Sequence, residues 1–272
     1  MPDSLSAALA TLRSRYGPQA LRRGGSAEES GTWSTTVPVL DDVLTPGGIP
    51  RGRITLLAPA GRGPSGRLTL LQSLLALASR SHDTAYVDLA GTLDPGFLAD
   101  LGADLAACLV ISPGPERWER GLVMARALVT SGMPWVGIAL GWAQPRPALW
   151  EHALATIAEA VAKRGAICVI AAPAPVAAPL RHASSLTLVC ASAGWQRANG
   201  DVSGLRVRLT TGKNKLGAPG AEAHLLLRYP RPYATAEMLG LPSVVVPRLQ
   251  PSAAPEAWGL RGARPPHVAA RG

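Results

Sequence analysis

The string GRGPSGRLTL, residues 61–70, has the glycine spacing of a phosphate-binding loop, but two of its chemically important side chains are replaced. In the pattern G-x-x-x-x-G-K-S/T, glycines let backbone N–H groups surround phosphate oxygens, the lysine contacts the β- and γ-phosphates, and the hydroxyl binds Mg²⁺. Gly61 and Gly66 match, whereas Arg67 stands in the lysine position and Leu68 in the hydroxyl position. The sequence therefore predicts the shape of a phosphate site without its full chemistry.

Two interpretations of this loop stay open. A guanidinium group and glycine N–H groups both suit anions, so the loop can hold a phosphate, and ATP binding without hydrolysis is one interpretation. In the other, the two glycines only form a turn between a strand and a helix, and no cofactor is needed; we favour this second one. The residues of the vestigial phosphate loop are Gly61, Ser65, Gly66, Arg67 and Thr69.

Composition fits one α/β domain with extensions. Of the 272 residues 47% are hydrophobic but only 4% aromatic, so Ala, Leu and Val must form the core. The net charge of +9 permits weak, non-specific DNA binding without establishing it. No apolar run reaches the ~18–20 residues of a membrane span and the N-terminus lacks a secretory pattern. We expect a cytoplasmic protein without membrane contact.

Cysteines and histidines do not predict a metal site. Cys108, Cys168 and Cys190 are far apart and odd in number, which indicates free thiols in a reducing compartment. The apolar runs CLVIS and AICVIAA around the first two indicate buried strands. The five histidines lack ligand spacing.

Apolar runs and helical periodicities alternate along the chain, which predicts a doubly wound, mainly parallel sheet with helices on both faces. The sequence LRVRLTTGKNK and the sequence HLLLRY predict a closing antiparallel pair of strands. Predicted strands are 53–58, 84–90, 107–112, 135–141, 166–172 and 185–191; predicted helices are 68–80, a short one in 94–104, 116–130 and 148–163.

Three regions are predicted. Residues 1–32 hold a short helix at 5–16 and a polar linker, 33–246 form the core domain, and 247–272 form a Pro/Ala/Arg-rich tail that is disordered. The helix presents one apolar stripe, which must bury either against its own core or against a neighbouring chain, because about 12 residues do not fold alone. The stripe consists of Leu5, Leu9, Leu12 and Tyr16.

These segments resemble, in order, the core of the RecA recombinase family over roughly residues 5–230. The resemblance is carried by ALATLRSRYGPQALRRGG, GGIPRGRI (47–54), YVDLAGTLDP (86–95) and LTTGKNKLGAP (209–219). It implies a RecA-like fold. It also implies that the N-terminal helix and the lysines Lys213 and Lys215 lie where recombinases contact the adjacent subunit; two solvated charges on a turn are the alternative for the lysines.

The chain departs from this family at the residues of ATP hydrolysis. The family's water-activating glutamate falls on Ala90 and its Walker B aspartate on Leu140, and APAPVAAPLRHAS (172–184) is too short for the second DNA-binding loop. Phosphoryl transfer needs a metal ligand, a neutralised γ-phosphate and a positioned water. We therefore expect no enzyme activity and no catalytic residues. The rival is a divergent DNA-dependent ATPase or recombinase in which Asp88, Glu116 or Glu119 replaces the lost acid.

A degenerate RecA-like domain with an arginine in the phosphate loop and a basic tail is similar to the ImuA family, accessory proteins of SOS mutagenesis and translesion synthesis. This resemblance implies a non-catalytic adaptor in damage-induced mutagenesis, associated with the nucleoid when it is recruited to damaged DNA. Its partners would be an ImuB-type Y-family polymerase homologue, an error-prone C-family polymerase and, as a further candidate, RecA. A regulator that caps or inhibits RecA filaments is the alternative, and sequence does not separate the two.

Overall fold

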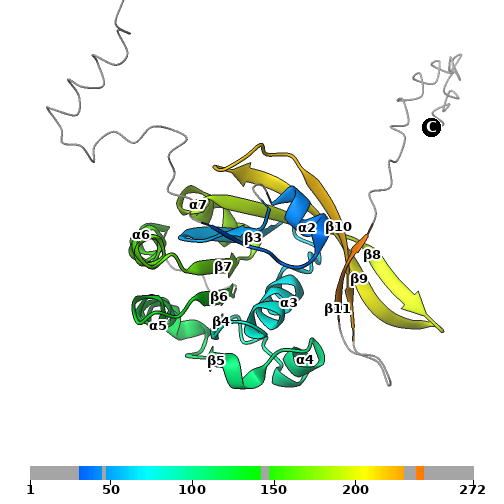
Figure 1. Cartoon of the computed structure of the whole chain (residues 1–272), viewed down its shortest axis with the longest axis horizontal. Helices are drawn as coiled ribbons and strands as arrows, with labels where there is room; N and C mark the ends of the chain where they lie inside the picture. The colour runs from blue at the N-terminus through cyan, green and yellow to red at the C-terminus, as the bar shows by residue number, and fades with distance from the viewer. Residues whose placement is uncertain (1–30, 45–46, 142–146, 230–236, 242–272) are drawn as a thin grey trace, which may run out of the picture. The chain divides into compact units, whose positions relative to one another are not determined.

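A nine-stranded sheet organises the chain in the computed structural model (Figure 1), which describes residues 31–44, 47–141, 147–229 and 237–241. Its strand order is β11-β10-β9-β8-β3-β7-β6-β4-β5. The strands are β3 (Arg53–Pro59), β4 (Thr84–Leu89), β5 (Cys108–Ile111), β6 (Trp135–Leu140), β7 (Ile167–Ala171), β8 (Leu186–Ala198), β9 (Asp201–Asn214), β10 (Glu222–Arg228) and β11 (Glu237–Leu241).

The sheet has a parallel and an antiparallel part. From β8 through β3, β7, β6 and β4 to β5 every pairing is parallel, whereas β8, β9, β10 and β11 pair antiparallel. Strands β4, β6 and β7 are buried along their whole length, as expected for parallel strands covered on both faces. The predicted α/β fold class and the closing antiparallel pair are confirmed.

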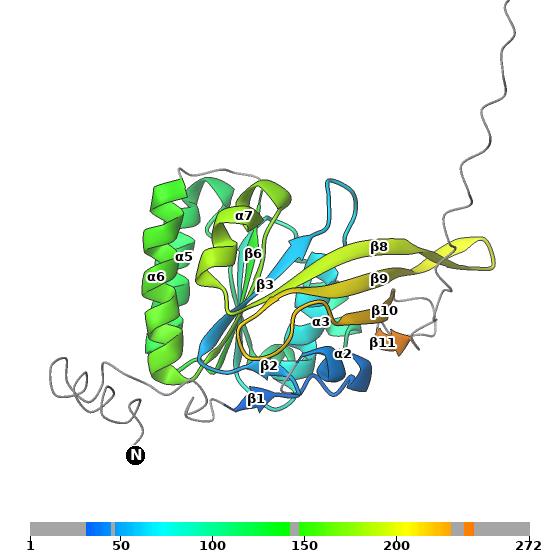
Figure 2. The same ribbon diagram turned by 90° about the horizontal axis from the view of Figure 1, so that it is seen from above.

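Helices cover both faces of the parallel part (Figures 1 and 2). One face packs against α3 (Arg67–Ser79) and α4 (Pro95–Asp100), with Leu74 of α3 fully buried, and on the same side α2 (Pro38–Val43) packs against β10 and β11 of the antiparallel part. The opposite face packs against α5 (Trp118–Thr130), α6 (Pro147–Arg164) and α7 (Ala174–Ala183). Asp94 caps α4, since its carboxylate accepts a hydrogen bond from the Gly96 N–H at 2.8 Å.

Strands β8 and β9 form a hairpin that extends beyond the rest of the sheet, visible in Figure 2. Asn199 and Gly200 form its two-residue connection with φ of 52° and 88°, the left-handed conformation that a tight hairpin turn requires. Trp195 and Val202 near this turn are 49% and 42% exposed. The apolar run 185–191 had predicted only the buried beginning of β8.

Several elements differ from the sequence expectations. Residues 172–184 contain helix α7 despite an internal Pro179, and β11, α2 and the small pair β1 (Thr32–Trp33) and β2 (Ile49–Pro50) had not been predicted. The strand around Cys108 was predicted to be buried, which is wrong: β5 lies at the sheet edge, and this thiol is only half-buried. Cys168 and Cys190 are buried, and all three thiols are free.

Two predicted regions cannot be compared with the structure. The helix with Leu5, Leu9, Leu12 and Tyr16 and the tail 247–272 lie outside the described residues. Within the described ranges, no helix combines the length and apolar character needed to cross a bilayer.

The Leu74→Ala substitution is expected to lower the free energy of unfolding by about 2–5 kcal/mol, because it leaves a cavity beneath α3. Chemical denaturation monitored by circular dichroism measures this loss. Leu105→Ala is the matched control, since Leu105 is 48% exposed and its truncation should change stability by less than about 0.5 kcal/mol. Equal losses in the two variants would contradict the arrangement of this core.

Candidate functional site

The candidate phosphate loop connects the end of β3 at Pro59 to the start of α3 at Arg67. The N–H of Ala60 donates to the carbonyl of Cys190 on β8 at 2.8 Å, which fixes the start of the loop on the neighbouring strand. The helix begins after Gly66, whose φ of 70° lies in the left-handed region. The structure therefore places this segment where a phosphate loop lies in a parallel α/β sheet, after a strand and before a helix.

The two motif glycines have different surroundings. A Cβ on Gly66 would lie 2.7 Å from Val207 Cγ2 and 2.9 Å from Leu205 Cδ2, both on β9. A Cβ on Gly61 would meet no atom within 4 Å. Gly66 is thus required for packing, whereas Gly61 is exposed and leaves space at the mouth of the loop.

Arg67 is half-buried, and its guanidinium group lies near Ser65 and Cys190. Its Nη1 is 3.4 Å from the Oγ of Ser65, a side chain only 3% exposed. Burial lowers the pKa of Arg67, and the nearby Cys190 acts in the opposite direction. Burial also raises the pKa of the Cys190 thiol to about 12, so the thiol is neutral and supplies no counter-charge.

The buried Nε of Arg67 has no hydrogen-bond partner among the described residues. A partly desolvated cation with an unsatisfied donor favours an anion as its partner. The Arg67 guanidinium group is therefore the group of this loop that an anion would contact, and Leu68 offers no hydroxyl to a metal ion. Sequence reasoning missed that Cys190 lies near this arginine, because only the parallel pairing of β3 with β8 brings them together.

Thr69, the last residue predicted for the loop, is directed to other partners. Its carbonyl accepts a hydrogen bond from Ser73 Oγ at 2.8 Å within α3. Burial raises the pKa of Tyr229, and a hydrogen bond with the Thr69 side chain opposes this shift. Thr69 therefore links α3 to the end of β10 rather than facing the loop.

The carboxyl ends of β4 and β6, where the family's acidic residues would lie, carry apolar side chains. Leu140 at the end of β6 is 1% exposed, and Ala90 directly follows β4. The two strand ends touch: a Cβ on Gly141 would lie 2.7 Å from the Leu89 carbonyl oxygen and 3.2 Å from Ala90 Cα. Close packing fills the space between these strand ends.

Asp88 has a structural environment. The buried carboxylate accepts hydrogen bonds from the N–H groups of Ala90, Thr92 and Leu93 at 3.1, 2.9 and 2.9 Å. Both of its oxygens are therefore used in holding the turn after β4. Removal of this carboxylate would leave three backbone donors without their partner.

Glu116 and Glu119 lie far from the loop. Both follow β5, which is four strands from β3 in the sheet, and strand spacings of about 4.8 Å place that edge roughly 19 Å away. The structure does not bring these carboxylates to the loop. Within the described residues, no group of three or more His, Cys, Asp or Glu side chains could hold a metal ion.

Lys213 and Lys215 lie at the end of β9 but differ in their contacts. The Lys213 ammonium group donates to the carbonyl of Arg181 in the last turn of α7, a favourable position for a cation at a helix C-terminus. Burial lowers the pKa of Lys213, and Lys215 adds to this shift. Lys215 is exposed and its backbone N–H is bonded to Ser185, so its side chain is the more accessible of the two.

A glycine loop between the central strand of a mainly parallel sheet and the helix that follows this strand defines the class of P-loop-like α/β proteins. The family model for the RecA N-terminal domain matches residues 3–138, half of the chain, so the chain belongs to the RecA family. This confirms the RecA-like part of the resemblance and leaves its ImuA part a prediction.

Curated relatives carry the name protein RecA. That of Lactobacillus acidophilus is 27% identical over 262 residues, covering 83% of this chain and 70% of the relative. Those of Haemophilus ducreyi and Lactiplantibacillus pentosus are 36% and 34% identical over 132 residues. These two alignments cover 47% of this chain and only 34% of each relative.

Gly66→Ala is expected to destabilise the protein by about 1–3 kcal/mol, because the residue needs a left-handed φ and its methyl group would contact β9. Gly61→Ala is the matched control and should change stability by less than about 0.5 kcal/mol. Thermal and urea denaturation of both variants measure the difference. If the two variants are equally stable, the packing role assigned to Gly66 is wrong.

Proposed function

We propose that this protein is a non-catalytic, RecA-like adaptor in damage-induced mutagenesis, of the ImuA type. It docks onto an ImuB-type Y-family polymerase homologue and an error-prone C-family polymerase during translesion DNA synthesis. The observation that carries the non-catalytic part is the apolar carboxyl edge of the sheet, with Ala90 and Leu140 at the strand ends and Leu68 at the start of α3.

Phosphoryl transfer depends on groups that neutralise charge and position a water. Apolar residues replace three hydrolytic groups at the carboxyl edge of the sheet, and the three replacements together argue against ATP hydrolysis more strongly than any one of them. The rival ATPase needs a relocated acid, but the oxygens of Asp88 accept backbone hydrogen bonds and Glu116 lies after the distant edge strand. Anion binding at Arg67 is compatible with an adaptor, since binding needs no metal ligand or general base.

Docking is the remaining task for a RecA-shaped domain without hydrolysis. The N-terminal stripe with Leu9 and Leu12 is the candidate docking arm, and exposed Lys215 is a second contact. A regulator that caps or inhibits RecA filaments would use the same surfaces, so the two binding functions differ in partner alone. The partner recovered in a binding experiment decides between them.

ATP turnover by the full chain should be indistinguishable from a no-protein blank, with or without single-stranded DNA. The Arg67→Lys/Leu68→Thr variant should be equally inactive, because it restores the loop but not the acids lost at Ala90 and Leu140. Phosphate release measured over hours, with a RecA protein as positive control, tests both. Sustained release that scales with the concentration of the chain and disappears in Arg67→Ala would revive the ATPase.

Charges in the apolar stripe should abolish docking. Leu9→Asp/Leu12→Asp is expected to weaken binding to an ImuB-type partner at least tenfold, since two buried leucines contribute about 1.5–3 kcal/mol each. Thr11→Asp/Ser14→Asp is the matched control, with the same charge added away from the stripe. Co-purification and titration calorimetry measure binding, and melting temperatures should stay within a few degrees. Unchanged affinity in the stripe variant would rule out the docking arm.

A further inference from the structure

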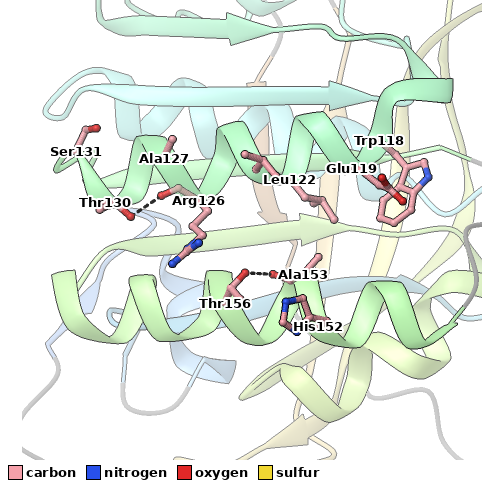
Figure 3. Close-up of a pocket in the computed structure, with 11 residues that line it drawn as sticks. Trp118, Glu119, Leu122, Arg126, Ala127, Thr130, Ser131, His152, Ala153 and Thr156 are labelled. Carbon is pink, nitrogen blue, oxygen red and sulfur yellow. Dashed lines mark hydrogen bonds between the residues drawn. The ribbon is translucent and has the colours of Figure 1, made fainter.

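A groove runs along the outer surface between helices α5 and α6 (Figure 3), with a volume of about 640 Å³. It lies on the helical layer opposite α3 and is separate from the phosphate loop. Its lining includes Trp118, Glu119, Val123 and Arg126 of α5 and His152 and Thr156 of α6.

The middle of this groove is apolar, and its charges lie toward the two ends. Val123 is 66% exposed, the largest exposed fraction among the large apolar side chains of the described residues. Glu119 lies beside Trp118 at one end, whereas Arg126 reaches toward α6 nearer the other end (Figure 3). An amphipathic helix suits such a surface, since helix-in-groove recognition pairs an apolar stripe with an apolar floor.

The described chain begins close to this groove. The carbonyl of Gly31 accepts a hydrogen bond from the Arg51 N–H at 3.0 Å. The next residue, Gly52, contacts the last turn of α6, because a Cβ there would lie 3.7 Å from the Ala162 carbonyl oxygen. The N-terminal segment therefore leaves the described structure beside the C-terminal end of α6.

We propose that residues 5–16 of the same chain occupy the groove between α5 and α6 as a helix. Their stripe from Leu5 to Tyr16 is about 17 Å long at 1.5 Å per residue, and the groove along α5 from Trp118 to Ser131 is about 20 Å long. In this position the stripe places its leucines over the exposed side chain of Val123.

Charge complementarity sets the direction of the seated helix. The segment carries Asp3 near its start and Arg13 and Arg15 near its end. With the helix antiparallel to α5, the arginines lie near Glu119 and Asp3 lies near Arg126. The parallel direction would bring like charges together at both ends.

The linker is long enough for this arrangement within one chain. From Ala162 to Trp150, which stacks on Trp118 with ring centroids 4.7 Å apart, α6 spans about 18 Å. The linker must therefore run back at least about 18 Å, from the Trp118 end of the groove to the Ala162 end of α6 beside Gly31. Residues 17–30 can extend to about 48 Å, and a flexible chain of that length has a root-mean-square span of about 20 Å.

If the N-terminal helix binds in this groove, which we call its seat, it has two alternative binding sites: the groove of its own chain and the partner. The part of the inference that concerns a partner rests on the proposed function, in which the same stripe docks onto another protein. Since one stripe cannot occupy both sites, the intramolecular contact competes with the partner. The seat itself does not depend on the identity or existence of that partner.

Disulfide cross-linking of the full chain tests the seat. Leu9→Cys and Val123→Cys are combined with Cys108→Ser, which removes the half-buried thiol; burial raises the pKa of Cys168 and Cys190 to about 12, so these two stay unreactive. Under mild oxidation most molecules should form an internal cross-link that is independent of protein concentration. The control pairs Leu9→Cys with Val202→Cys, a second exposed valine (42%) on the β8–β9 hairpin, and should remain uncross-linked.

Each alternative outcome overturns the seat. A cross-linked dimer would show that a second copy occupies the groove, and equal cross-linking of the control would show an arm without a defined seat. Hydrogen exchange supplies a second readout that needs no partner: Val123→Arg should accelerate exchange in residues 5–16 at least tenfold. If exchange is unchanged and no cross-link forms while Leu9→Asp/Leu12→Asp still abolishes partner binding, the seat is wrong and the docking arm stands.

Discussion

The left-handed turn at Gly66 joins the two parts of the sheet, and most of the structure depends on the contact made there. Because the residue has no side chain, the start of α3 can lie directly against Leu205 and Val207 of β9 and Leu227 of β10. The core on this face of the sheet therefore runs without interruption from the parallel strands to the antiparallel ones. A glycine that appears in the sequence as part of a phosphate motif serves in the fold as a packing residue.

The same packing explains how a RecA-like fold can persist without the acids of its edge. A carboxylate at the end of a buried strand costs free energy unless a metal ion or hydrogen-bond donors satisfy it. Leucine at 140 and alanine at 90 remove that cost, and the strand ends then approach closely at Gly141. Asp88 persists because three N–H groups of the following turn require an acceptor. The carboxylate that remains is thus the one that the backbone needs.

Sequence reasoning predicted the elements whose side chains are buried and missed those defined by long-range contacts. Apolar runs located β3, β4, β6 and β7 within about two residues, because burial on both faces leaves a continuous signal. The outer halves of β8 and β9 lie beyond the helices and carry no such signal, and α7 was missed because proline is a poor helix former. The strand around Cys108 was predicted to be buried because its sequence is as apolar as that of the central strands. Its position at the edge of the sheet, which leaves it partly exposed, is visible only in the structure.

Within the candidate site, the sequence correctly placed the loop between a strand and a helix but could not assign the environments of its residues. Gly61 and Gly66 are equivalent members of the sequence motif, and only the contact of Gly66 with β9 distinguishes them. Likewise, only the structure shows that Arg67 is half-buried, that its Nε has no hydrogen-bond partner among the described residues and that Cys190 of β8 lies near it. The groove between α5 and α6 had one signal in the sequence, Val123 on the polar side of an amphipathic helix, which is too weak to interpret without the structure.

A helix with two seats couples docking to the stability of the intramolecular contact. A flexible linker of this length gives the helix an effective concentration on the order of millimolar at its own groove. If the seated form outnumbers the free form about tenfold, the apparent affinity for a partner falls about tenfold, since only the free fraction can bind. A contact with the solvent-exposed Val123 is weak, which suits such competition. The contact covers the stripe, but a partner with a deeper groove can displace the helix.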